Sequence, residues 1–179
     1  DTLHSCLLQE YANLEILVVN DGSTDGSEEI VRPFLKIFPQ IKWISKPNGG
    51  LGSARNKGMA IASGQLLQFL DADDQLSTDK ILNQVMLFAN HSEMEVSYTP
   101  YLCYEDGNPE NTWTYSRVEM KDDPALDLIE NWEKDLSIPV HCFLYRKEYV
   151  ESVRFDEELP NHEDWLFHLQ TASLGGRYG

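Results

Sequence analysis

The hydrophobic pattern in the first half of the chain predicts strands that alternate with helices. Three short apolar runs, at residues 15–20, 41–45 and 66–70, lack the polar and apolar alternation of a half-exposed strand. Each run leads into a loop rich in Gly or Asp, and a helical pattern lies between successive runs. Because strands that alternate with helices usually pair in the same direction, this order predicts a parallel sheet covered on both faces.

Caps and hydrophobic period predict three helices in the same half. The strongest pattern covers residues 78–90, where Ser77 would cap a helix whose apolar positions recur every three or four residues. Residues 52–62 form a second predicted helix, which a following glycine would end. Residues 28–38 form a third, which should be short or kinked because Pro33 lacks the N–H group that an interior turn needs.

The pattern changes in the second half of the chain. Residues 96–104 and 138–146 are predicted strands, and a polar stretch with many acids, residues 105–135, separates them. A final helix is predicted from residue 163 to residue 174, where it ends at two glycines.

Length and composition predict one domain with a buried core. The chain has 179 residues, of which 41% are hydrophobic and 25% are charged, close to the globular average. Since no repeat or linker divides the chain, we expect a single domain over residues 1–179, with a nucleotide-binding-like half at 1–95 and a variable half at 96–179. No stretch approaches the ~20 apolar residues of a membrane span, so the sequence excludes a transmembrane role for this segment.

The charge of the chain narrows the choice of partners. Lys and Arg total 14 against 30 Asp and Glu, a net charge of −16, which argues against a surface that neutralises nucleic-acid phosphates. An acidic protein that binds an anionic ligand usually needs a metal ion or local cations between them, because like charges repel.

The cysteines suggest neither a zinc site nor a disulfide framework. There are three, at positions 6, 103 and 142, and they form no C-x-x-C pair. This usage predicts buried thiols in a reducing compartment.

Asp21 is the first candidate ligand-binding residue. It directly follows the predicted strand at residues 15–20, and ligands of open α/β sheets bind outside the carboxyl ends of the strands. Its carboxylate could accept a hydrogen bond from a ribose hydroxyl or a base N–H group. The alternative is that residues 21–23 only make a turn before a helix cap, and the residues alone leave both open.

Arg55 lies in a Gly-rich loop that opens a predicted helix, residues 48–56. Glycines let the backbone approach a phosphate closely, although the spacing matches neither a dinucleotide fingerprint nor a Walker loop. In so acidic a chain, Arg55 is a candidate contact for a diphosphate or a base. A structural ion pair with a nearby Asp is the alternative.

Asp71, Asp73 and Asp74 directly follow the buried run at residues 66–70. Carboxylates so close together repel one another, and a bound divalent cation relieves that repulsion most simply. If the chain stays extended, Asp71 and Asp73 point to the same side and can share one metal. Oxygen ligands without His or Cys suit Mg²⁺ or Mn²⁺, so we favour a metal site over a solvated acidic loop.

Residues 162–165, with the sequence H-E-D-W, begin the last predicted helix. Acids at a helix start interact favourably with the helix dipole, which gives a purely structural explanation. In the functional interpretation one carboxylate, desolvated near Trp165, is a general base that removes a proton from a hydroxyl. The spacing does not decide between the two.

Taken in order, these segments resemble the family 2 glycosyltransferases, inverting enzymes with the GT-A fold that use nucleotide sugars. The resemblance runs over residues 7–174. It rests on four motifs in succession: Q-x-Y-x-N-L-E-I-L-V-V-N-D-G-S-T-D, N-G-G-L-G-S-A-R-N-x-G, L-D-A-D-D and F-D-E-E-L-x-x-x-E-D-W.

The resemblance implies a donor site. Asp21 would read the nucleotide base, usually uracil, and Arg55 would lie over the base and the diphosphate. Asp71 and Asp73 match the D-x-D pair, in which Asp71 lies towards the ribose and Asp73 ligates the Mn²⁺ or Mg²⁺ that bridges the diphosphate. Asp74 would be a supporting carboxylate.

The resemblance also implies the chemistry on the acceptor side. Asp164 takes the position of the catalytic base, and Glu163 lies beside it and helps to hold the acceptor. The metal would neutralise the leaving nucleoside diphosphate while Asp164 removes the proton of the acceptor hydroxyl, so that one displacement inverts the anomeric carbon.

Partners and location follow from the same resemblance. It implies a nucleotide-sugar donor, most often a UDP-sugar, and a carbohydrate or glycoconjugate acceptor in polysaccharide biosynthesis. The expected location is cytoplasmic, with peripheral membrane association left open. Neither the donor sugar, the acceptor nor the oligomeric state follows from the sequence.

The sequence departs from the family pattern at its start. Family members normally begin with an apolar central strand, whereas residues 1–4 fall within the helix that should follow that strand. We therefore expect the first strand of the fold to be missing from this sequence. His141 falls in a predicted strand near the acceptor side and is left without a role. The alternative function is a non-catalytic module of the same fold that binds a nucleotide sugar or a metal.

Overall fold

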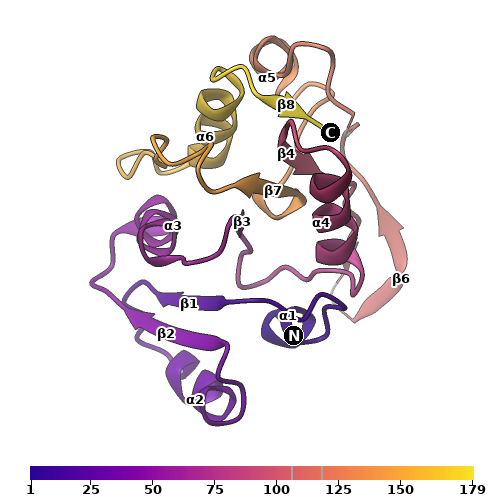
Figure 1. Cartoon of the computed structure of the whole chain (residues 1–179). Coiled ribbons are helices and arrows are strands. Elements are labelled where there is room, and N and C mark those ends of the chain that lie inside the picture. The colour runs from indigo at the N-terminus through magenta and orange to yellow at the C-terminus, as the bar shows by residue number, and fades with distance from the viewer. Residues whose placement is uncertain (106, 118) are drawn as a thin grey trace.

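The structure is a computed structural model that describes residues 1–105, 107–117 and 119–179. Helices and strands alternate through the first half, and the second half adds shorter elements (Figure 1). The elements are α1 (Thr2–Leu7), β1 (Ile16–Asn20), α2 (Ser27–Ile37), β2 (Ile41–Ser45), α3 (Gly50–Ile61), β3 (Leu66–Gln68), α4 (Lys80–Asn90), β4 (Met94–Tyr98), β5 (Cys103–Glu105), β6 (Asn108–Trp113), α5 (Pro124–Asn131), the 3₁₀ turn η1 (Val140–Cys142), β7 (Phe143–Arg146), α6 (Glu163–Ala172) and β8 (Arg177–Tyr178).

The first two strands form a parallel pair, as predicted. β1 and β2 pair in register from Ile16 opposite Ile41 to Asn20 opposite Ser45. Helix α3 packs against β1, and α2 packs against β2. Every residue of β1 is only half-buried, so the prediction of a strand buried on both faces is wrong. In the described part of the chain β1 pairs with no strand other than β2.

The third strand does not join that pair, which corrects the prediction of one parallel sheet. β3 belongs to a separate sheet with the order β3-β7-β4-β8. β7 is antiparallel to both β3 and β4, and β8 is parallel to β4. β3 and β4 follow each other in the chain, but β7, some 45 residues further on, lies between them in the sheet. A local β-α-β pattern cannot reveal such a long-range partner.

The helices in the first half differ from their predicted bounds by a few residues. α4 begins at Lys80 with Asp79 as its N-cap, so Ser77 does not cap it. α3 begins at Gly50, two residues before the predicted start. α2 keeps its full 11 residues although Pro33 lies inside it, so it is not shortened.

The second half differs more from its prediction. Residues 96–104 divide into β4 and β5, and residues 138–146 divide into η1 and β7. The polar stretch contains β6, which pairs with β5 as a hairpin, and the helix α5; neither β6 nor α5 was predicted as a separate element. The start of α5 has a sequence signal: Asp123 accepts a hydrogen bond from the backbone N–H of Leu126 at 3.0 Å, and Pro124 occupies the first turn.

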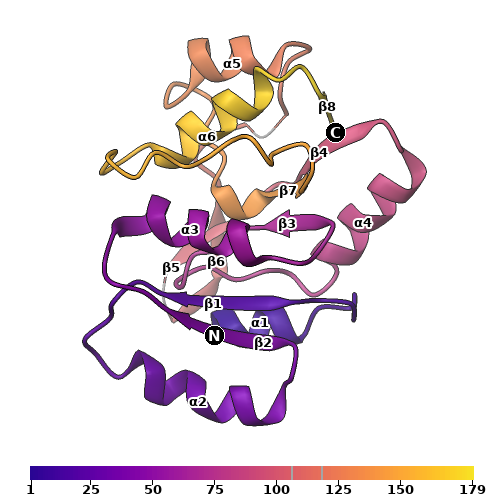
Figure 2. The ribbon, with the colours of Figure 1, turned by 60° about the vertical axis from the view of Figure 1, so that its left-hand side comes forward.

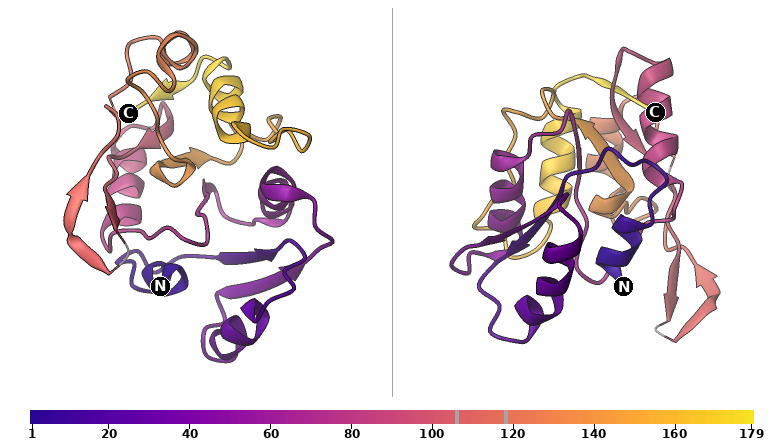
Figure 3. Two further views of the ribbon diagram at one scale, coloured as in Figure 1. Left: turned by 180° about the vertical axis from the view of Figure 1, so that it is seen from behind. Right: turned by 60° about the horizontal axis from the view of Figure 1, so that its bottom comes forward.

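The main core lies between the second sheet and α6. Its centre is a group of aromatic rings, of which Phe155 and Phe167 stack at 4.0 Å between centroids, with Phe69 edge-on to both. The views in Figures 1 and 2 place α3 beside α6, and the two helices are in contact. The hairpin of β5 and β6 projects from the opposite side of the molecule (Figure 3).

Two broader expectations can be compared with the structure. All three cysteines are free, but only Cys142 is buried, whereas Cys6 and Cys103 are half-buried. Among the described residues, no helix has the length and apolar character needed to cross a bilayer.

His168 gives the core a pH-dependent stability. Its ring is buried and its Nδ1 lies 2.8 Å from the hydroxyl of Tyr145. Burial, aided by the charge of Arg55, lowers the pKa of His168 from 6.5 to about 3. A group with a lowered pKa contributes stability that is complete above its unfolded pKa and is lost as the pH falls towards the folded value.

We therefore predict that the free energy of unfolding falls between pH 6.5 and pH 4, with His168 contributing up to ~1.4 kcal/mol per pH unit. His168→Asn keeps a side-chain acceptor but cannot titrate in this window, so its unfolding free energy should depend less steeply on pH. Urea denaturation at several pH values measures both slopes. Equal slopes in the two proteins would contradict this assignment.

Candidate active site

The register of β1 and β2 places Asp21 beside Lys46. The backbone N–H of Lys46 donates to the carbonyl of Asn20 at 3.0 Å, which continues the parallel pairing beyond the strand ends. The ammonium group of Lys46 then forms an ion pair with the Asp21 carboxylate. Asp21 also accepts hydrogen bonds from the backbone N–H groups of Gly49 at 3.1 Å and Gly50 at 2.7 Å.

Asp21 therefore holds the Gly-rich loop against the end of β1. Burial raises the pKa of its carboxyl, but the hydrogen bonds from Lys46, Gly49 and Gly50 outweigh burial and leave the pKa below its ordinary value. The glycine at position 22, with φ of +78°, permits this approach, since a Cβ atom there would lie 2.8 Å from the backbone nitrogen of Asn48. Asp21 thus has a structural role that the sequence did not predict, and base reading stays a prediction.

Arg55 joins two of the predicted motifs. Its Nη2 donates to both carboxylate oxygens of Asp71, at 2.8 and 3.0 Å, and its Nη1 donates to Glu163 Oε1 at 2.7 Å. The Arg55 and Glu163 side chains are only 9% and 8% exposed, whereas Asp71 is 34% exposed. Burial lowers the pKa of Arg55, but the two carboxylates outweigh burial, so the guanidinium is held firmly in its charged form.

Neighbouring groups fix the place of the guanidinium. Its central carbon lies 5.3 Å from the ring centroid of Phe155. The side chain of Asn56 holds the Phe155 backbone from both sides, donating to the carbonyl at 2.8 Å and accepting from the N–H at 2.9 Å. At Gly52 a Cβ atom would lie 2.8 Å from the carbonyl oxygen of Asp156, so only glycine lets α3 approach this segment so closely.

The acidic loop after β3 is a turn and not an extended segment. The backbone N–H of Asp74 donates to the carbonyl of Asp71 at 3.2 Å. The argument that Asp71 and Asp73 share one side of an extended chain therefore fails. Instead, Asp71 pairs with Arg55, the exposed Asp73 has no ion-pair partner in the described part of the chain, and Asp74 Oδ2 lies 2.8 Å from Nδ1 of His141.

The residues present do not form a closed metal site. In residues 1–105, 107–117 and 119–179, no three His, Cys, Asp or Glu side chains gather closely enough to hold an ion. Asp73 nevertheless offers an exposed oxygen ligand beside Asp71. Mg²⁺ typically binds through one or two protein carboxylates together with waters and substrate phosphates. The donor set fits a hard cation that is held jointly with a phosphate-bearing ligand.

Glu163 and Asp164 form the first turn of α6. His162 precedes them in the left-handed region, with φ of +64°, and its carbonyl accepts the first helical hydrogen bond from Leu166 at 3.0 Å. Glu163 is buried against Arg55, and Asp164 is half-buried and accepts the backbone N–H of Trp165 at 2.7 Å. Burial raises the pKa of Asp164 above its ordinary value, which suits a general base.

The structure connects the four predicted segments, because Asp21 accepts hydrogen bonds from the Gly-rich loop and Arg55, which follows that loop, donates to Asp71 and Glu163. Arg55, the Asp71 loop and the start of α6 meet directly, whereas Asp21 pairs with Lys46 and has no hydrogen bond to Arg55 among the described contacts. A family model described as glycosyl transferase family 2 matches residues 1–154. The chain belongs to this family.

Curated relatives agree with the family assignment. The minor teichoic acid biosynthesis protein GgaB of Bacillus subtilis is 31% identical over 178 residues, which cover 94% of this chain and 19% of that protein. An uncharacterized glycosyltransferase of Haemophilus influenzae is 34% identical over 169 residues, which cover 92% of this chain and 62% of the relative. The family 2 chain therefore spans only part of the length of these relatives.

Solved structures of other proteins share the fold of this chain. TarS of S. aureus in complex with UDP-GlcNAc matches 97% of this chain and 49% of its own, with a TM-score of 0.72 and 24% identity. The mannosyltransferase PcManGT of Pyrobaculum calidifontis, in complex with GDP-Man and Mn²⁺, matches 99% of this chain and 48% of its own, with a TM-score of 0.69 and 20% identity. The expected α/β class with the GT-A fold is confirmed.

Several residues around the candidate active site were not predicted from the sequence. Lys46 had a usable signal, because it follows the strand that lies next to β1, as Asp21 follows β1 itself. Asn56 stands in the same motif as Arg55, but its contact with Phe155 spans 99 positions of the chain and has no local signal. The pairing of His141 with Asp74 has no local signal either, because it depends on β7 lying beside β3.

The Arg55 ion pairs give a prediction for stability. Arg55→Met should lower the free energy of unfolding by about 3–5 kcal/mol, because it leaves the buried Glu163 without a partner. Arg32→Met is the matched control: Arg32 pairs with Glu28 on the exposed face of α2, and its loss should cost no more than ~0.5 kcal/mol. Urea denaturation measures the unfolding free energy of both variants. Equal losses would contradict the view that the buried Arg55 pairs stabilise the protein more than an exposed pair does.

Proposed function

We propose that this chain carries the donor site and the catalytic base of an inverting glycosyltransferase that moves a sugar from a nucleoside diphosphate to an acceptor hydroxyl. One observation carries the proposal. The buried guanidinium of Arg55 holds the acidic loop of Asp71 and the start of α6 together, which supports the assignment of Asp73 and Asp164, close to these partners in the chain, to one site. Membership of glycosyl transferase family 2 supports the reaction class.

The charges of the site suit a nucleotide sugar bound with a metal. Asp71 and Glu163 share the guanidinium of Arg55, and Asp73, Asp74 and Asp164 follow them within three positions of the chain, so acids outnumber the arginine where a diphosphate would have to bind. We assign Asp73 as the ligand that would hold Mg²⁺ or Mn²⁺, with Asp71 beside it. When bound, such an ion would neutralise the charge that develops on the leaving diphosphate.

The protein residues divide the remaining tasks. Asp21 and Lys46 hold the Gly-rich loop, whose exposed backbone at the start of α3 would line the nucleotide. Asp71, fixed by both its oxygens to Arg55, would accept from a ribose hydroxyl. Asp164 would remove the proton of the acceptor hydroxyl as its oxygen attacks the anomeric carbon, so that a single displacement inverts the configuration.

Relatives and fold neighbours suggest the substrate class. TarS was solved with UDP-GlcNAc and PcManGT with GDP-Man and Mn²⁺, and GgaB is named for teichoic acid biosynthesis. We therefore propose a UDP-sugar or GDP-sugar donor and a carbohydrate or glycoconjugate acceptor in the synthesis of a polysaccharide.

The first test is a calorimetric screen of nucleoside diphosphates and their sugars, with Mn²⁺ or with EDTA. We predict binding of a uridine or guanosine diphosphate that depends on the metal. Asp73→Asn should weaken this binding by more than the ~10-fold that an outer-shell partner of a metal is typically worth. Asp122→Asn, which changes an exposed carboxylate outside the four motifs, should bind as the wild type does. Equal binding in EDTA would refute the role of Asp73.

The second test addresses the base. Asp164→Asn should lower kcat by about 10²–10⁴-fold while leaving metal-dependent nucleotide binding intact, and the change of an exposed carboxylate outside the motifs, Glu148→Gln, should change neither. Because a base must be ionised and the pKa of Asp164 is raised, kcat should fall with falling pH through a midpoint above the ordinary pKa of an Asp carboxyl. Release of nucleoside diphosphate measures the rate. Full turnover in Asp164→Asn would rule out the base assignment.

A further inference from the structure

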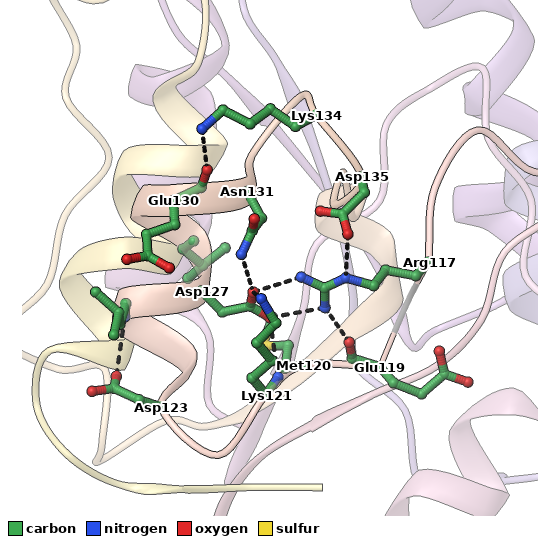
Figure 4. Close-up of polar contacts among 12 residues, drawn as sticks. Arg117, Glu119, Met120, Lys121, Asp123, Asp127, Glu130, Asn131, Lys134 and Asp135 are labelled. Carbon is green, nitrogen blue, oxygen red and sulfur yellow. Dashed lines mark hydrogen bonds and ion pairs between the residues drawn. The ribbon is translucent and has the colours of Figure 1, made fainter.

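A second buried carboxylate, Asp127, lies outside the proposed site. Its side chain has no exposed surface. Arg117 donates to its two oxygens at 2.8 and 2.5 Å, the backbone N–H of Lys121 donates at 3.0 Å, and the amide of Asn131 donates at 2.7 Å (Figure 4). Burial raises the pKa of Asp127, but these hydrogen bonds outweigh burial and leave the pKa far below its ordinary value.

Arg117 extends this cluster to two more segments. Its Nε donates to Asp135 at 3.2 Å and its Nη1 donates to the carbonyl of Glu119 (Figure 4). We call Arg117 and Asp127 the clamp. It fastens α5, which carries Asp127, to the chain on both sides of the helix. α5 has only eight residues and leaves Leu126 and Ile129 exposed, so the clamp adds polar contacts to the packing that its buried residues supply.

The residue after Asp127 connects α5 to α6. Leu128 is fully buried, and its carbonyl is one of the last four of α5. No N–H group within the helix donates to these four carbonyls, so they need partners outside it. The indole N–H of Trp165 donates to this carbonyl at 3.0 Å. The two helices are packed against each other, as Figure 2 shows.

Trp165 directly follows the proposed base. Its backbone N–H donates to Oδ1 of Asp164 at 2.7 Å, so the residue that anchors α6 to α5 also holds the carboxylate of Asp164. The opposite side of this helical turn is fixed by Glu163 and Arg55. Trp165 therefore supplies the attachment of the first turn of α6 on the side away from Arg55.

We propose that Arg117, Asp127 and Trp165 are positioning residues for Asp164: the clamp fixes α5, the carbonyl of Leu128 fixes the indole of Trp165, and Trp165 fixes the base. The inference rests on the proposed function of Asp164. A buried ion pair adds little net stability compared with well-packed apolar side chains, so a role in geometry accounts for the clamp better than a role in stability alone.

Trp165→Phe tests the step from the indole to the base, because it removes the indole N–H group and keeps both an aromatic ring and the backbone N–H group. We expect kcat for nucleoside diphosphate release to fall about 10- to 100-fold, with the donor KM and the calorimetric Kd for the nucleotide unchanged. Trp132→Phe is the matched control, since the Trp132 ring also packs on α6, with its centroid 6.2 Å from that of the His168 ring. The kcat of this variant should stay within twofold of wild type. Equal effects of the two changes would overturn the proposal.

Asp127→Asn tests the step from the clamp to the indole. It should lower kcat by a similar factor, again without changing the nucleotide Kd. Because both residues act along one route, Asp127→Asn combined with Trp165→Phe should be no slower than the slower single variant. Multiplied losses in the double variant would contradict a shared route.

A readout without catalysis separates this inference from the proposed function. In the NMR spectrum of ¹⁵N-labelled protein, the indole N–H of Trp165 should be protected from hydrogen exchange in wild type and should lose at least tenfold of that protection in Asp127→Asn. Unchanged protection would overturn the clamp whatever the kinetics. If protection is lost in Asp127→Asn but Asp164→Asn keeps full turnover, the base assignment is refuted, and the positioning role is refuted with it. The link from the clamp to the indole of Trp165 would still be established.

Discussion

The whole arrangement depends on a buried arginine that is shared by two carboxylates. Arg55 lies between Asp71, which follows β3, and Glu163, which begins α6. A guanidinium can donate to two partners at once in a fixed plane, which a lysine cannot do. Its burial makes each bond costly to break, because the partner that remains would keep an uncompensated charge. Two segments that are 92 positions apart in the chain thereby become one site.

The same constraint organises the residues around the arginine. Phe155 lies under the guanidinium, Asn56 holds the Phe155 backbone, and Gly52 lets α3 approach it. On the far side of α6, the indole of Trp165 is bonded to α5. The first turn of α6 is thus held from two directions, and Asp164 lies between them with its pKa raised by burial. A base needs both features, a fixed position and a proton affinity above that of a solvated carboxylate.

Much of this could be predicted from local sequence and some could not. The parallel pairing of β1 with β2 and the existence of α2, α3, α4 and α6 follow from short patterns, and the motifs singled out Arg55, Asp71 and Glu163, whose side chains are in contact in the structure. The antiparallel pairing of β3 with β7 and the contact of His141 with Asp74 depend on chain segments more than 60 positions apart, which no local period encodes. Asp21 shows a third case: the oxygens of its predicted ligand role are bonded to Lys46, Gly49 and Gly50, which lie 25 to 29 positions away, so only the structure revealed these contacts.

The most direct test of this account is a double-mutant cycle on unfolding free energy with Asp71→Asn and Glu163→Gln, measured with Arg55 present and again in an Arg55→Met background. If one guanidinium holds both carboxylates, the two changes should couple by ~1 kcal/mol or more when Arg55 is present and should become additive when it is replaced. Additivity within ~0.5 kcal/mol in both backgrounds would contradict the claim that Arg55 joins the two halves of the site.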